Sequence, residues 1–92
     1  MLSGQAVVKP EDVRRFASEL KQFTSRLHSD SSRLQAQFKR LGETWRDQEH
    51  LRFAQEFEQA TKVFRKFMED SNQYVAYLIR KAEAAEVYLR QR

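Results

Sequence analysis

Apolar residues recur every three or four positions along two long segments of the chain. In the first segment they are Val13, Phe16, Leu20, Phe23, Leu27, Leu34, Phe38 and Leu41. In the second segment the same spacing links Phe53, Phe57, Ala60, Phe64, Phe67, Ser71, Tyr74, Leu78, Lys81, Ala85 and Tyr88. Besides the tyrosines, only Ser71 and Lys81 in this row are polar. Steps of three and four place side chains on one face of an α-helix. The pattern therefore predicts two amphipathic helices, at residues 10–41 and 48–90, and strand signals are absent.

The residues at the ends of these segments have the chemistry of helix termini. Pro10 suits a first helical position, because its fixed φ fits a helix and its missing N–H would be unpaired there. Gly42 follows the last apolar residue of the first segment, and we expect it to stop that helix in the left-handed conformation. Two residues compete to cap the second helix: Thr44, which has an acid three residues on, and Asp47 itself.

The interruption between the two helices, residues 42–47, contains the only tryptophan, Trp45. We expect an antiparallel two-helix hairpin whose turn motif is Gly42, Trp45 and Asp47, with the indole closing the end of the hairpin. The prediction is one all-α domain over residues 1–92, in which residues 1–9 form a flexible arm.

One stretch weakens the first helical pattern. Residues 28–32 read His-Ser-Asp-Ser-Ser, and Ser and Asp favour caps and turns over helix interiors. A break there would divide the first helix in two and give a three-helix bundle. The apolar stripe resumes after the gap in nearly the same phase, which favours one continuous helix.

A hairpin of this size leaves much apolar surface in water. Each helix has only one neighbour, and 92 residues bury a smaller share of their surface than a larger domain would. Beyond Ser71 the apolar arc is broader than one partner helix covers. We therefore expect dimerisation into a four-helix bundle, as a homodimer or as a heterodimer with a paralogous hairpin. The expected interface residues are Phe53, Phe57, Phe64, Phe67, Tyr74 and Leu78.

The position of the turn also predicts which residues face each other. Antiparallel pairing around Trp45 sets Phe38 opposite Phe53 and Phe23 opposite Met68. Because the second helix is longer, it would extend past the first by about 20 Å, from Arg80 onward, at about 1.5 Å of rise per residue.

Charge and composition exclude several classes of function. The net charge is +4, from 17 basic and 13 acidic residues interleaved along the chain, and cysteine is absent. A nucleic-acid site would need the row Arg15, Arg26, Arg33 and Arg40, but the acids among them indicate a solvated face, so no nucleic-acid partner is expected. No apolar run has the length of a membrane span, and the first residues lack the basic start of a signal peptide.

Enzymatic chemistry has no support in the sequence. His28 and His50 lie on different segments, no cysteine nucleophile is present, and no glycine-rich phosphate loop or metal-ligand spacing occurs. We interpret Glu49 and His50 as solvated residues at the start of an exposed helix, beside the cap. The prediction is a protein without catalytic residues, metal or cofactor.

These features resemble the Trp-Xaa-Gly family of small, early-secreted-antigen-like proteins handled by type VII secretion systems. The resemblance rests on the chain length, the hairpin pattern, and the residues Leu34, Phe38 and Leu41 before the turn, Trp45 in it, and Phe53 and Phe57 after it. It implies a hairpin homodimer or heterodimer that is exported without an N-terminal signal peptide. It also implies a secretion substrate, co-substrate or adaptor, with the secretion machinery as a partner.

The sequence departs from that family at two places. Asp47 stands where the family has glycine. The family's export signature, a tyrosine followed four residues later by an acid, does not occur, since Tyr74, Tyr77 and Tyr88 are followed at that distance by Leu78, Lys81 and Arg92. The alternative is a structural subunit, either a cytoplasmic coiled-coil scaffold or a hairpin that polymerises, which would need two different complementary patches.

Overall fold

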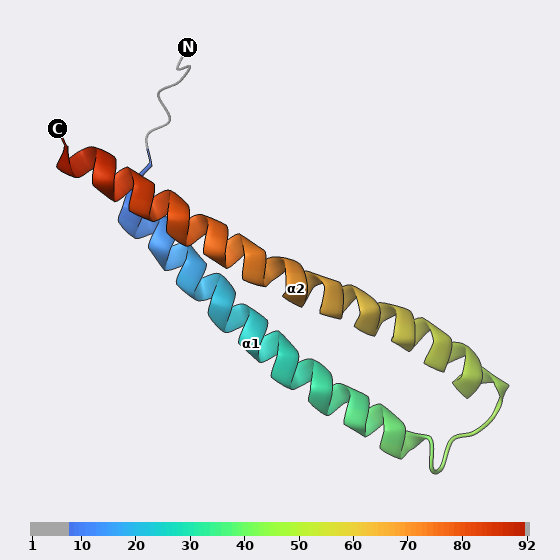
Figure 1. The fold of residues 1–92 in the computed structure, drawn as a ribbon. Helices are drawn as coiled ribbons and strands as arrows, with labels where there is room; N and C mark the ends of the chain where they lie inside the picture. The colour runs from blue at the N-terminus through green and yellow to red at the C-terminus, as the bar shows by residue number, and fades with distance from the viewer. Residues whose placement is uncertain (1–7, 92) are drawn as a thin grey trace.

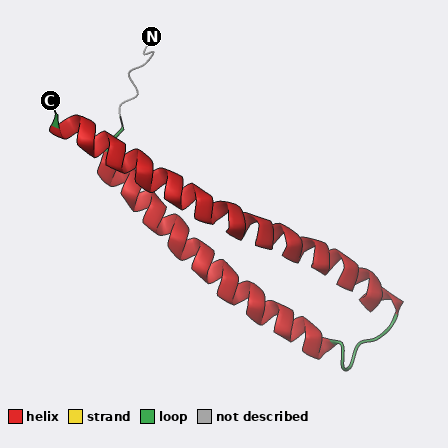
Figure 2. Cartoon of the chain, viewed as in Figure 1, coloured by secondary structure: helices red, strands yellow, loops and turns green. Residues whose placement is uncertain are grey.

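The chain forms a helical hairpin. A computed structural model describes residues 8–91, and in that part the elements are α1, Pro10–Leu41, and α2, Gln48–Arg90 (Figure 1). The described residues include no strand (Figure 2). The predicted all-α hairpin is thus confirmed. Of the expected arm, residues 1–9, all but the last two positions lie outside the described part.

α1 is continuous through the polar stretch at residues 28–32, so the three-helix alternative is wrong. Ser31 is one of only three buried residues of α1 and accepts a hydrogen bond from Gln35 Nε2 at 3.1 Å. Asp30 pairs with Arg33 at 2.8 Å, one turn along the helix. The polar stretch is therefore the point at which α1 presents a small side chain to its partner helix.

The hairpin is a single layer of two helices. Its principal extents are 67 × 26 × 14 Å, and the smallest is close to the diameter of about 10–12 Å of one helix with its side chains. The only hydrophobic residues buried in the described part are Ala17 and Ala82, and the largest fully buried side chain is that of Ser71. No large side chain is completely enclosed, because no third helix covers the pair.

α2 contacts α1 through a row of residues that we call the inner seam. Its members step by four and three, and each is buried or half-buried: Phe57, Thr61, Phe64, Met68, Ser71, Val75, Leu78, Ala82 and Ala85. The sequence pattern predicts Phe67, Tyr74 and Lys81 there in place of Met68, Val75 and Ala82. That assignment is wrong, because small residues such as Ser71 and Ala82 let the two helices approach closely, whereas the large rings lie to one side.

The side chains packed along the inner seam differ in size from one end of the hairpin to the other. Alanines are buried near the termini, Ser71 and Thr24 share a hydrogen bond of 2.6 Å midway, and aromatic rings pack near the turn. The ribbons correspondingly separate toward the turn in Figure 1. Phe38 lies against Phe53 as predicted, with ring centroids 5.5 Å apart. Farther from the turn the predicted register is wrong by a helical turn or more, because Thr24 meets Ser71 and Arg14 meets Glu86.

The predicted long overhang of α2 is wrong. Ala82 has 0% exposure, and Glu86 pairs with Arg14 across the hairpin at 2.8 Å, so α2 is still in contact with α1 well beyond Arg80. The first turn of α2 lies beside the turn segment, where His50 contacts Trp45. Part of the extra length of α2 is therefore taken up at the turn.

Candidate interaction surface

Helical hydrogen bonding continues from α1 into the turn. Gly42 has φ −63° and ψ −12°, in the right-handed region, and its N–H lies 3.2 Å from the carbonyl oxygens of Phe38 and Lys39. The Trp45 N–H donates to the Leu41 carbonyl at 3.0 Å. α1 does end at Leu41 with Gly42 next in the chain, as predicted, but the expected left-handed conformation of Gly42 is wrong. A Cβ at Gly42 would lie 3.3 Å from the Lys39 carbonyl oxygen, a tight contact, and 3.6 Å from His50 Nε2, an ordinary one.

Asp47 is the residue that caps α2. It has extended backbone angles, φ −96° and ψ −172°, and its carboxylate accepts a hydrogen bond from the His50 N–H at 2.9 Å. The Thr44 hydroxyl makes only a long contact of 3.4 Å with the Leu41 carbonyl. The bond from the His50 backbone lowers the pKa of Asp47 below 3.8, desolvation opposes it, and the Trp45 side chain lowers the pKa further. The capping competition is thus settled in favour of Asp47.

This cap predicts a loss of stability in acid. Because the pKa of Asp47 is lower in the folded chain than its ordinary 3.8, its stabilising effect is present above about pH 4 and is lost as the pH falls through the lower folded value. We expect Asp47→Asn, which can cap without titrating, to make the melting temperature less dependent on pH between about 2 and 5.

The measurement is thermal unfolding by circular dichroism at one protein concentration, with Glu49→Gln as the matched control. Glu49 lies in the same first turn of α2 but does not form the cap. Equal pH profiles for Asp47→Asn and the parent would show that the cap does not cause the acid response. Glu86 contributes to the loss of stability in acid in both the parent and Asp47→Asn, because the hydrogen bond from Arg14 lowers the pKa of Glu86.

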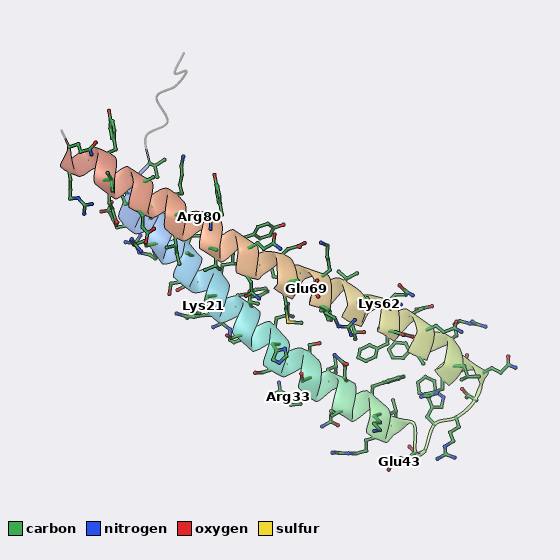
Figure 3. All side chains as sticks on the ribbon, viewed as in Figure 1. Lys21, Arg33, Glu43, Lys62, Glu69 and Arg80 are labelled. Carbon is green, nitrogen blue, oxygen red and sulfur yellow. The ribbon has the colours of Figure 1, made fainter. Side chains whose placement is uncertain are left out.

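An aromatic cluster fills the space between the helices next to the turn (Figure 3). Phe38 is at its centre, with ring centroids 4.9 Å from Phe57 and 5.2 Å from His50, on which it stacks at 13°. Trp45 meets the His50 ring edge to face at 5.0 Å and 77°. The indole therefore packs at the end of the hairpin, in contact with the first turn of α2.

His50 is the residue of this cluster that the sequence analysis misjudged. Its Nε2 is buried and has no hydrogen-bond partner among the described residues, so the expectation of a solvated histidine is wrong. The sequence does contain a signal for this position, because His50 precedes Phe57 by seven residues and Phe64 by fourteen. That spacing puts it on the same row of the inner seam.

An apolar groove lies beside the cluster, on one side of the hairpin. Its volume is about 620 Å³, and its apolar lining comes from Leu34, Leu41, Phe53, Phe57 and Phe38. Arg40, Glu43 and Thr44 contribute polar atoms. Leu34, Leu41 and Phe53 are all exposed, so the groove opens to solvent and large apolar side chains form it.

The groove continues into a longer stripe, which we call the apolar face. Its α1 members, Phe16, Phe23, Leu34 and Leu41, are all exposed and stand seven, eleven and seven residues apart, close to whole numbers of helical turns. On α2 the corresponding residues are Phe53, Phe67 and Tyr74. Phe23 meets Phe67 edge to face across the helices at 6.0 Å, which places both rows on the same side.

The opposite side of the hairpin is mainly polar, although Ile79 also lies there, and we call it the charged face. It carries Arg14, Lys21, His28 and Gln35 of α1 and Glu58, Arg65, Asn72, Ile79 and Glu86 of α2, each set spaced by seven residues. Arg14 forms two hydrogen bonds with Glu86, of 2.8 and 3.0 Å. The two sides of the layer therefore differ: one fits water and the other fits a partner.

The predicted site residues fall into three places. Gly42, Trp45 and Asp47 lie together in the turn. Phe57, Phe64 and Leu78 lie on the inner seam and are half-buried against α1, whereas Phe53, Phe67 and Tyr74 lie on the apolar face. The sequence analysis did not select Phe16, Phe23 and Leu34, because it assigned the whole stripe of α1 to the contact with α2.

Other kinds of site have no geometric basis in residues 8–91. No group of three or more His, Asp or Glu side chains there could hold a metal ion. No helix in this part of the chain combines the length and apolar character needed to cross a membrane. Two arginines of the basic row are already paired, Arg15 with Asp12 and Arg33 with Asp30, both at 2.8 Å.

The fold and this surface define a small helical-hairpin protein with an aromatic turn and a one-sided apolar face. The chain belongs to the WXG100 family, described as proteins of 100 residues with WXG, whose model matches residues 5–91. Proteins of this family are small helical proteins associated with type VII secretion, and they pair as hairpin dimers. In this chain the motif reads Trp45-Arg46-Asp47. Neither the curated proteins nor the solved structures give a match.

Proposed function

We propose that this protein is a non-enzymatic interaction protein that pairs through its apolar face with a second hairpin and acts as a substrate or co-substrate of type VII secretion. The second hairpin is its own copy or a paralogue. The observation that carries the proposal is the exposure of the apolar face, where Phe16 is 59% exposed and Leu34 52%. Contiguous exposed apolar side chains of this size mark a protein–protein contact.

The large solvent-accessible surface area of the chain supports the proposal that a partner covers part of it. Its accessible surface is 7622 Å², roughly a third more than the about 5,600 Å² expected of a compact monomer of 11.0 kDa. An excess of this order is what one partner contributes to an obligate interface, which buries about 2,000–5,000 Å² in total. Pairing two layers face to face would convert two open hairpins into one four-helix bundle with a shared core.

The pairing part of the proposal predicts opposite results for the two sides of the hairpin. Phe16→Glu places a charge on the apolar face, so we expect it to raise the dissociation constant by about tenfold or more. Gln35→Glu introduces the same charge on the charged face and should leave association unchanged. Sedimentation equilibrium over about 1–100 μM, alone and with a candidate paralogue, measures both. Equal association of the two variants would overturn the use of this face.

The secretion part has a separate test. The protein should accumulate in the culture medium of cells with an intact type VII apparatus and stay inside cells that lack it, while a cytosolic marker shows that lysis does not release it. Export that is independent of the apparatus, or none, would overturn this part. Concentration-dependent filaments in the sedimentation experiment would instead indicate the polymerising structural subunit.

A further inference from the structure

α2 carries a second row of contact positions, beside the inner seam, that α1 covers only in part, where Phe23 meets Phe67. We call it the outer seam. It consists of Ala60, Val63, Phe67, Asp70, Tyr74, Tyr77, Lys81, Ala84 and Tyr88, which step by three and four without a slip. Such alternation over several turns is the pattern of a helix that packs along another helix. One helix with two adjacent seams is built to contact two partners.

The exposure of the outer seam shows that its partner is not within the hairpin. Val63 is 66% exposed, Tyr77 56% and Tyr88 66%, although these are among the largest apolar and aromatic side chains of α2. In the same helix, Ser71 and Ala82 of the inner seam have 0% exposure. The tyrosines of α2 thus all lie on the outer seam, and all three are exposed.

The order of residues along the outer seam is matched to an antiparallel copy of itself. If Tyr74 of one helix lies opposite Tyr77 of the other, every other position of the outer seam except Ala60 finds a counterpart by symmetry. Phe67 then meets the small Ala84, Val63 meets Tyr88, and the acid Asp70 meets the base Lys81. Two charges interrupt this seam, and they have opposite signs at positions related by the same two-fold axis. A self-complementary patch is what a closed, symmetric dimer requires.

We propose that α2 pairs antiparallel with α2 of a second copy of this chain through the outer seam, with Asp70 of each copy beside Lys81 of the other. This rests on the proposed pairing function and specifies its partner, its direction and its register. Asp70 already lies 2.9 Å from Lys66 of its own helix, so Lys81 of the second copy would add a second cation to that carboxylate. A parallel arrangement would place like charges together at both positions, which disfavours it.

The test uses charge exchange. In a dimer of Asp70→Lys, two lysines would meet at each of the two 70–81 contacts. In a dimer of Lys81→Asp, two aspartates would meet at each of them. We expect the dissociation constant of each variant to rise by about tenfold or more in sedimentation equilibrium at low salt. Mixing the two variants should restore association to within about threefold of the parent, because the mixed dimer pairs opposite charges at both sites. The matched controls are Glu69→Lys and Arg80→Asp, which make the same charge changes one residue away at exposed positions.

Each outcome decides something. Restoration on mixing supports the register, and it also shows that both variants fold. If the parent dimerises and neither single variant weakens its association, the proposed contact through the outer seam is wrong. The proposed pairing through the apolar face would still stand. If both single variants associate more weakly than the parent and mixing them does not restore association, the antiparallel register is wrong. A parent that stays monomeric at about 100 μM while it binds a paralogous hairpin would overturn self-pairing and retain the proposed function.

Discussion

Phe38→Ala should lower the free energy of unfolding by about 3–4 kcal/mol, the lower part of the range for removing a packed phenyl ring, because Phe38 is half-buried. The phenyl ring is the common neighbour of His50, Phe53 and Phe57. Its removal opens a space at the wide end of the hairpin, and no third helix is present to fill it. The cluster then loses contacts on both helices at once.

Denaturant unfolding measures this effect by two signals: circular dichroism for the helices and the fluorescence of the single tryptophan, Trp45, for the cluster. The control is Leu51→Ala, at a residue that is 62% exposed, for which we expect a change within about 0.5 kcal/mol. Protein concentration must be the same in all samples, because pairing adds to the apparent stability. Similar losses for the two variants would contradict a central role for Phe38.

Ser71→Leu should destabilise the hairpin by about 1–3 kcal/mol. Ser71 has 0% exposure and lies 2.6 Å from the Thr24 hydroxyl on the opposite helix. Thr24 donates its own proton to the Leu20 carbonyl at 2.8 Å, so Ser71 is the donor in the bond between the helices. A leucine at this position would both remove that donor and force the two helices apart at their close contact.

Two further substitutions separate volume from hydrogen bonding in the same unfolding experiment. Ser71→Ala removes only the hydroxyl and should cost about 1 kcal/mol or less, because the Thr24 proton keeps its acceptor. Asn72→Leu, at the exposed neighbouring residue, adds a leucine of the same size outside the contact and should change stability within about 0.5 kcal/mol. A Ser71→Leu variant more stable than the parent would show that the seam has room for larger side chains.

The hairpin itself was predictable because its signals are local. Apolar spacing, Pro10 at a helix start and the polar turn around Trp45 are each visible within a few residues, and they can be recognised without knowledge of the partner helix. The cap on α2 was narrowed to Thr44 or Asp47 for the same reason. Choosing between them required the actual turn geometry, in which only Asp47 reaches the His50 N–H.

The direction in which the apolar stripe faces was not predictable from spacing alone. Phe57, Phe64 and Leu78 can form a seam either with the row of Phe67 and Tyr74 or with the row of Met68 and Val75, because the apolar arc of α2 includes both rows. The sequence analysis chose the row with the larger rings. Both rows share Ser71, but the structure buries Thr61 and Ala82 beside it and leaves Tyr74 and Tyr88 exposed, since close approach of two helices needs small side chains. His50 was missed because its environment comes from Phe38, on the other helix.

The gradient from aromatic rings at the turn to alanines at the termini has a consequence for how the chain folds and opens. Phe38 and Phe53 are separated by a short loop, whereas Arg14 and Glu86 are 72 positions apart. Loop-closure entropy and the size of the contacts therefore both favour nucleation at the turn and closure toward the termini. Tension applied to both ends would load the weak alanine end first and break the cross-helix contacts in sequence toward the turn.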